Sequence, residues 1–353
     1  MPPAARPVAR LSEPGEIAAL VPVLCGFVPH ESLVVVSLRG ARKLVGLTMR
    51  FDLDWARDGG RGAVEEVAGR LALDGAERAL LVVLSDQSDP DGTARGDDRL
   101  AWAALVDEAM EVCEARGVPV VEALLVREGR WWSFLCHGQG CCPAAGTPVE
   151  VEPTQALRLL ASEQVLEGRA VLASREELVR SLAPPVLLAA AAAEQHLDRA
   201  VLAWVERHRQ EGADALRAHG VTAAGRLLAS SLSPGGVSAA EAAQLAVSLH
   251  DLRVRDEIAT WGLTDPGPLL AMLLQVARQV VPPEDTQVCA LIGWVAYAKG
   301  DGALVNVALD RALSSNPDCS LALLLRELLD RQIAPEEVRR LLADTRAGLR
   351  DQV

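Results

Sequence analysis

The chain is poor in lysine and in aromatic residues. Of its 353 residues only Lys43 and Lys299 are lysines, and phenylalanine, tryptophan and tyrosine together make up 3%. A core with so few rings must consist mainly of leucine, valine and alanine. Acidic side chains outnumber basic ones by 48 to 35, which leaves a formal net charge of −13. We therefore expect neither nucleic acid nor an anionic membrane surface as a partner, because both require a clustered basic face.

Long hydrophobic runs are also missing. Uncharged runs such as residues 286–298 are shorter than the eighteen or so residues that a membrane-spanning helix requires. The apolar segment 17–27 follows Glu13 and Glu16 and no small-residue cleavage site follows it, so we interpret it as a short helix of the folded domain. The seven cysteines lack the even spacing of a secreted disulfide framework. A cytoplasmic location is therefore expected.

The hydrophobic periodicity changes near residue 154, and a chain of this length suits two domains. Strand-like segments alternate with helix-like ones in the first half. The predicted strands are 32–38, 43–51, 79–84, 120–126 and 131–135. The first two are expected to form an antiparallel hairpin, and the strand–helix–strand order implies right-handed crossovers. We predict an α/β N-terminal domain over 1–153, with a mixed sheet covered by helices.

Two helices are expected between these strands. A glycine-rich loop at 59–62 leads into a helix with Val64, Val67 and Leu71 on one face. A second helix is expected over 100–116, where Gly117 is a suitable C-cap.

The second half is predicted to be helical almost throughout. A helical connection over 154–183 leads to an all-α domain of helical hairpins over 184–353. Its expected helices are 186 to about 210, 238–250, 251–261, 266–281, 286–299, 303–314, 319–329 and 335–349.

One segment of this domain carries a repeat-like pattern. Small Gly293, aromatic Tyr297, the Gly300-Asp301 turn and Pro317 have the spacing of two paired helices. Residues 287–319 resemble one tetratricopeptide repeat. One repeat needs neighbours to form a groove, and the flanking helices are candidates for them. A protein partner is therefore expected at the helical domain, and a purely structural helical domain is the alternative.

A cysteine-rich turn follows the last predicted strand. Cys136, Cys141 and Cys142 lie close to His137, and thiolates with imidazole are the ligands that zinc prefers. Adjacent cysteines do not match the usual zinc spacing. Buried structural thiols and a redox or nucleophilic site are the other interpretations, and the latter needs a nearby positive charge to lower a thiol pKa.

A second candidate site follows the strand 79–84. Ligands bind at the carboxyl ends of strands in open α/β sheets, so Asp86 and Ser88 in the loop 85–92 are candidate ligands for a divalent cation or a small molecule. Ser32, Arg50 and Asp52, at the ends of the first two predicted strands, complete the candidate ligand-binding set. A solvated surface loop is the simpler interpretation.

Several short motifs occur together in this chain: Gly26-Phe27-Val28-Pro29, residues 31–36, Arg50-Phe51-Asp52, Trp131-Trp132 before Cys136, Cys141-Cys142-Pro143 with Gly146-Thr147-Pro148, and residues 174–177. Together they resemble the actinobacterial Domain of Unknown Function 4192 family over nearly the whole chain. The resemblance implies that the cysteine turn and the turn at 27–32 are family features. It implies no activity, so no catalytic role is carried over.

The sequence favours a binding or regulatory protein over an enzyme. The metalloprotease H-E-x-x-H, the hydrolase G-x-S-x-G and the S-x-x-K motifs are all absent. The alternative is a thiol- or metal-dependent enzyme, with zinc as a candidate cofactor, that uses Cys136, Cys141 or Cys142.

Overall fold

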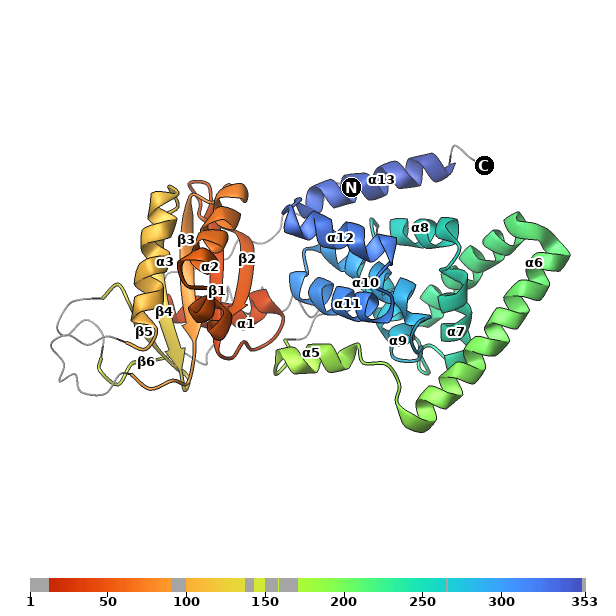
Figure 1. The fold of residues 1–353 in the computed structure, drawn as a ribbon, viewed down its shortest axis with the longest axis horizontal. Coiled ribbons are helices and arrows are strands. Elements are labelled where there is room, and N and C mark those ends of the chain that lie inside the picture. The colour runs from red at the N-terminus through yellow and green to blue at the C-terminus, as the bar shows by residue number, and fades with distance from the viewer. Residues whose placement is uncertain are drawn as a thin grey trace. The chain divides into compact units, whose positions relative to one another are not determined.

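The computed structural model describes residues 13–89, 100–136, 143–149, 158, 171–264 and 266–350. The chain divides into two compact units, Met1–Arg175 and Glu176–Val353, and each is described by itself (Figure 1). The first combines a mixed sheet with helices and the second is helical, which confirms the predicted fold class. Of the predicted helical connection at 154–183, the structure describes residues 158 and 171–183, which include the helix Arg175–Ser181, and the other residues lie outside the described part of the chain.

The first unit is built on a six-stranded sheet with the order β2-β1-β3-β4-β5-β6. Its strands are β1 (Ser32–Arg39), β2 (Leu44–Asp52), β3 (Arg78–Leu84), β4 (Val120–Arg127), β5 (Arg130–Ser133) and β6 (Thr147–Pro148). Strands β1 and β2 form the predicted antiparallel hairpin. β3 is antiparallel to β1 and parallel to β4, so the sheet is mixed. The carboxyl ends of β2, β3 and β4 therefore share one edge with the start of β1.

Helices α2 (Leu53–Leu73) and α3 (Ala103–Ala115) pack against one face of this sheet. Helix α1 (Pro14–Cys25) contacts β2, β4 and β5. The glycine-rich loop expected at 59–62 is reduced to a break at Gly60, because helical residues of α2 flank that position on both sides. Gly60 adopts φ 51° and ψ −140°, a break that a residue without a Cβ tolerates, and the helix then resumes.

The elements of the second unit that the structure describes are all helices. They are α5 (Arg175–Ser181), α6 (Leu187–Ser230), α7 (Ala239–Ser248), α8 (Leu252–Trp261), α9 (Pro266–Ala277), α10 (Asp285–Lys299), α11 (Gly302–Ser315), α12 (Ser320–Asp330) and α13 (Pro335–Arg350). Helix α10 is buried along nearly its whole length. It contacts α7, α8, α9, α11, α12 and α13. The predicted pairing of α10 with α11 is present, and α10 ends at Gly300 with φ 83°.

Helix α6 consists of two arms that meet at a sharp break at Gly212, where φ is 81° and ψ is 174°. The first arm agrees with the helix expected from 186 to about 210, whereas the second arm, which continues to Ser230, is not predicted from the sequence. The two arms form a V in Figure 1. A Cβ on Gly220 would lie 3.4 Å from the Trp204 ring, so the second arm folds back close to the first.

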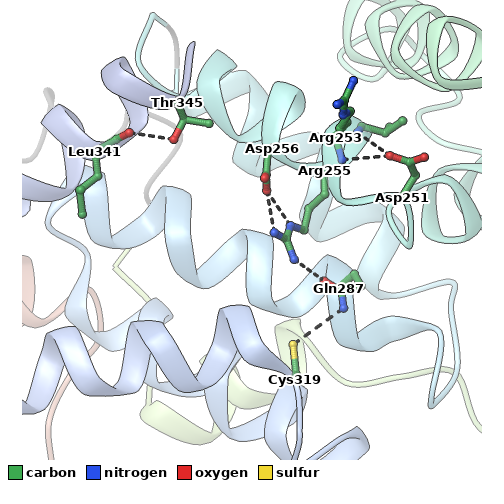
Figure 2. Close-up of polar contacts among 9 residues, drawn as sticks. Asp251, Arg253, Arg255, Asp256, Gln287, Cys319, Leu341 and Thr345 are labelled. Carbon is green, nitrogen blue, oxygen red and sulfur yellow. Dashed lines mark hydrogen bonds and ion pairs between the residues drawn. The ribbon is translucent and has the colours of Figure 1, made fainter. Parts of the chain in front are cut away.

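Polar side chains connect the helices of this unit (Figure 2). Arg255 on α8 donates to Asp256 through Nε at 2.9 Å and Nη2 at 2.7 Å, and its Nη1 lies 3.5 Å from Gln287 Oε1 on α10. Gln287 Nε2 is 3.9 Å from Cys319 Sγ, at the start of α12. Asp251 caps α8 by accepting from the Arg253 backbone N–H at 2.9 Å. The network fixes α8, α10 and α12 relative to one another.

Within the described residues, none of the helices combines the length and the apolar character needed to cross a lipid bilayer.

Candidate functional site

Polar side chains from four segments lie at the carboxyl edge of the sheet, which is the end where β2, β3 and β4 finish and β1 begins. Ser32, at the start of β1, pairs with Asp52 at the end of β2 and with Leu84 at the end of β3. Strand β4 ends beside them at Arg127. This edge is where the sequence predicts a ligand, and the register brings the predicted Ser32 and Asp52 into direct opposition.

Arg50 is the central side chain of this edge. Its Nε donates to Ser32 Oγ at 2.8 Å, and its Nη2 donates to Asp52 Oδ1 at 2.6 Å. Ser32 Oγ donates in turn to the His30 carbonyl oxygen at 2.7 Å. The Arg50 side chain is 20% exposed and that of Asp52 67%. The guanidinium is therefore held by its neighbours while part of it still faces solvent.

Cys25 lies within the electrostatic reach of this guanidinium. Burial raises the pKa of the Cys25 thiol to about 12, and the positive charge of Arg50 opposes that shift only in part. The raised pKa disfavours the thiolate form, which is the nucleophilic form of cysteine.

Glu31 connects the turn before β1 to the loop after β3. Its Oε2 accepts from Ser85 Oγ at 2.8 Å, and its Oε1 accepts from the Asp86 backbone N–H at 2.9 Å. Ser85 is 3% exposed and also accepts from Trp102 Nε1 at 3.1 Å. Glu31 itself adopts a left-handed φ of 41°, a conformation that costs free energy in a non-glycine residue. The Glu31 carboxylate thus connects the start of the loop 85–89 to the turn before β1 through two hydrogen bonds.

The exposed rim of the site carries an acid–base pair. His30 Nε2 lies 2.9 Å from Asp86 Oδ2, and the two side chains are 70% and 60% exposed. Together with Asp52, the pair gives this edge of the sheet two exposed carboxylates and an exposed imidazole.

Arg127, the last residue of β4, binds the other end of the loop 85–89. Its Nη2 donates to Asp89 Oδ2 at 2.8 Å and its Nη1 to the Gln87 carbonyl oxygen at 2.7 Å. The guanidinium also lies 4.9 Å from the centre of the Trp132 ring, within cation–π distance. The hydrogen bond from Arg127 lowers the pKa of Asp89 below its ordinary value. The loop segment 85–89 is therefore attached to both β1 and β4.

The structure thus places four of the five predicted ligand-binding residues in one connected group. Arg50 bonds directly to Ser32 and Asp52, and Asp86 is linked to them through His30, whose ring lies 2.9 Å from Asp86 Oδ2 and whose carbonyl oxygen accepts from Ser32 Oγ. Ser88 is exposed on the same loop. Sequence reasoning missed Glu31 and Ser85 as connecting residues. A usable signal existed, because both flank the ends of β1 and β3, adjacent antiparallel strands that meet at this edge.

The cysteine turn is only partly described. Cys136 is half-buried, whereas Cys141 and Cys142 lie outside the described residues. In the part of the chain that the structure describes, no group of three or more His, Cys, Asp or Glu side chains is arranged to hold a metal ion. The zinc prediction therefore stays a prediction.

Comparison with family models gives a match over most of the chain. A family model described as "Domain of unknown function (DUF4192)" matches residues 14–336. Neither the comparison with curated proteins nor the comparison with solved structures finds a match.

Proposed function

The chain belongs to the DUF4192 family, and because the family's description names no activity, we propose a function from this chain's own geometry. We propose that it is a binding protein. Its α/β unit takes a small polar ligand at the carboxyl edge of the sheet, and its helical unit contacts a protein.

The observation that supports the ligand site is the partly exposed Arg50 between Ser32 and Asp52. Its Nε and Nη2 are engaged, and among the described residues none accepts from Nη1. A guanidinium held in this way is oriented in advance for an oxygen of a ligand, which lowers the entropy cost of binding.

The exposed carboxylates define the rest of the ligand. Asp52 and Asp86 can accept from hydroxyl or amino groups, and His30 can either donate or accept. The arrangement suits a small molecule that carries a carboxylate, phosphate or carbonyl oxygen together with hydroxyl or amino groups. A bare anion fits less well, because the two carboxylates would repel it.

The proposal favours binding over catalysis. The Ser85 hydroxyl is buried and donates to Glu31, and the Cys25 thiol is held protonated by burial. The alternative thiol- or metal-dependent enzyme relies on Cys136, Cys141 and Cys142, and no observation on the described residues favours it.

For the helical unit, we propose a role in protein contact. The pairing of α10 with α11 supports the resemblance of 287–319 to a tetratricopeptide repeat. Helix α10 is buried, however, so a contact surface must come from other helices of the unit. We also propose a cytoplasmic location, supported by the buried free thiols Cys113, Cys289 and Cys319.

A thermal-shift screen tests the ligand site. The panel contains sugar phosphates, hydroxy acids, amino acids, nucleotides and divalent cations. We expect a polar compound that raises the melting temperature of the wild type and not that of Arg50→Gln or Asp86→Asn. Arg57→Gln is the matched control, because Arg57 lies on α2, is 58% exposed and pairs only locally with Asp54 and Asp58.

Two outcomes contradict the ligand site. One is a panel in which no compound shifts the wild type. The other is a compound whose effect survives in Arg50→Gln and Asp86→Asn as fully as in Arg57→Gln. Hits limited to divalent cations would redirect the assignment to a metal site at the same carboxylates.

A further inference from the structure

The outward face of the first arm of α6, residues 187–211, carries apolar side chains in solvent. The inward face is buried in the core of the helical unit through Ala193, Leu197 and Ala200. On the opposite face, Leu202 is 70% exposed and Val205 59%. These two large aliphatic side chains lie one helical turn apart and form a small contiguous apolar patch in solvent.

Charged residues flank this apolar pair in an ordered way. Asp198 and Arg199 precede it, and Glu206 and Arg209 follow it. Residues 198, 202, 205 and 209 are spaced four, three and four apart, which places them on one stripe of the helix. On the side of the helix that carries this pair, the charges run negative at Asp198, positive at Arg199, negative at Glu206 and positive at Arg209, whereas Arg207 lies on the opposite side and pairs with Glu211 at 3.2 Å. Read in the reverse direction, every sign changes, so the stripe is complementary to itself when turned end to end.

We propose that the occupant of this face is a second copy of the chain, whose α6 packs antiparallel across the first. The two-fold axis passes between Leu202 and Val205, so that Leu202 of each copy contacts Val205 of the other. Asp198 of each copy then lies opposite Arg209 of the other, four residues outside the apolar pair on each side. The inference rests on the proposed protein-contact role of the helical unit and names its partner.

The other pair of charges agrees with the same orientation. With Leu202 opposite Val205, Arg199 of one copy lies within one helical turn of Glu206 of the other and on the same side of the contact. A parallel pair would instead place Asp198 against Asp198 and Arg209 against Arg209, which is destabilising. The charge order therefore favours the antiparallel arrangement.

The charges are available for such a contact. Among the described residues, none forms a hydrogen bond or ion pair with the side chain of Asp198 or with that of Arg199. Arg209 pairs with Glu206 in its own chain at 2.7 Å, and those side chains are 74% and 50% exposed. An exposed pair of this kind contributes little, so exchanging it for a pair between copies costs little.

Sedimentation velocity of the full-length chain from about 1 to 200 µM tests the association. We expect the wild type to pass from monomer to dimer over this range. Leu202→Asp should raise the dissociation constant by roughly tenfold or more, because it places a carboxylate in the apolar centre. The matched control is Leu232→Asp, at a position 65% exposed just beyond α6, and it should dimerise as the wild type does.

Charge reversal tests the antiparallel orientation. Asp198→Arg and Arg209→Asp should each weaken self-association, because each places like charges opposite one another. Mixing the two variants should restore it as a heterodimer, since the reversed charges then meet opposite ones. Restoration also shows that both variants are folded.

Three results would overturn the inference. They are a wild type that stays monomeric throughout the range, a Leu202→Asp variant that associates as Leu232→Asp does, and a mixture that associates no better than its components. The ligand screen on the α/β unit is read out separately. Failure of the dimer therefore leaves the ligand site to its own test.

Discussion

Replacing Arg311 by methionine is expected to destabilise the helical unit strongly. Arg311 Nε donates to Asp285 Oδ2 at 2.8 Å, Nη2 donates to the Val280 carbonyl oxygen at 3.1 Å, and Nη1 donates to the Leu182 carbonyl oxygen. The Asp285 side chain is 0% exposed and that of Arg311 10%. One guanidinium therefore satisfies a buried carboxylate and two backbone carbonyls on three different segments.

The loss of unfolding free energy follows from the buried groups that lose their hydrogen-bond partner in Arg311→Met. Methionine fills most of the volume but makes none of the three hydrogen bonds, so Asp285 becomes an unpaired buried carboxylate. Its Oδ1 already has no hydrogen-bond partner in the described part of the chain. Removing one partner of a buried ion pair costs about 3–5 kcal/mol of unfolding free energy. The double variant Asp285→Leu/Arg311→Met should lose less, because no charge then remains buried.

Urea unfolding followed by circular dichroism at 222 nm measures these losses. The matched control is Arg326→Met, since the Arg326 pair with Asp310 at 2.9 Å has side chains 33% and 57% exposed. This control should lose less than about 1 kcal/mol. Equal losses for Arg311→Met and Arg326→Met would refute the reasoning, and so would a double variant less stable than Arg311→Met alone.

Three further predictions concern backbone, thiols and pH. Gly62→Ala should stabilise the protein by roughly 0.5–1 kcal/mol, because its position in α2 has open space around it. Gly146→Ala should destabilise it by about 1–3 kcal/mol, since its φ is +71° and a Cβ would lie 2.5 Å from the Trp132 ring. Urea unfolding of both variants checks the two opposite signs.

Burial raises the pKa of Cys113 to about 11 and that of Cys289 to about 12, so these thiols should react with Ellman's reagent only after unfolding. Rapid reaction of both in the native protein would contradict this. Arg127 holds the pKa of Asp89 below its ordinary value, so the stability that Asp89 contributes is present above the ordinary aspartate pKa and is lost as the pH falls through the lowered one. Arg127→Gln should raise this pKa toward the ordinary value in a carboxyl-carbon NMR titration, and an unchanged titration curve would count against the pairing.

The secondary structure of the sheet was largely readable from local pattern. Residues 32–38 are valine and leucine apart from Ser32 and Ser37, and the structure buries all seven in β1. The turn at Arg39-Gly40-Ala41 then predicts the β1–β2 hairpin that is observed. Local composition suffices here because a strand buried on both faces consists mostly of apolar side chains.

The glycines show where local pattern fails. Gly60 interrupts α2 with a left-handed φ, whereas Gly62, two residues later, remains in the helix. Gly212 turns α6 back on itself, and the following arm to Ser230 was not predicted. The sequence permits a turn at each of these positions. The packing of the neighbouring helix faces selects which glycine turns, because each arm must bury its own apolar side.

The candidate site likewise combines features that the local sequence predicts with features that it does not. Ser32, Arg50 and Asp52 could be named from the sequence, because they flank the ends of two strands that local composition predicts to pair. The opposition of Ser32 and Asp52 could not, because the β1–β2 register shifts between Val36 and Leu38, and such a bulge moves every pair beyond it by one residue. The tertiary fold also selects Ser85, 54 residues away, as the partner of Glu31, and Arg311 as the partner of Asp285 in the helical core. Such pairs leave no periodic signal in the chain, because their partners are chosen by the fold that brings distant segments together and not by spacing along the sequence.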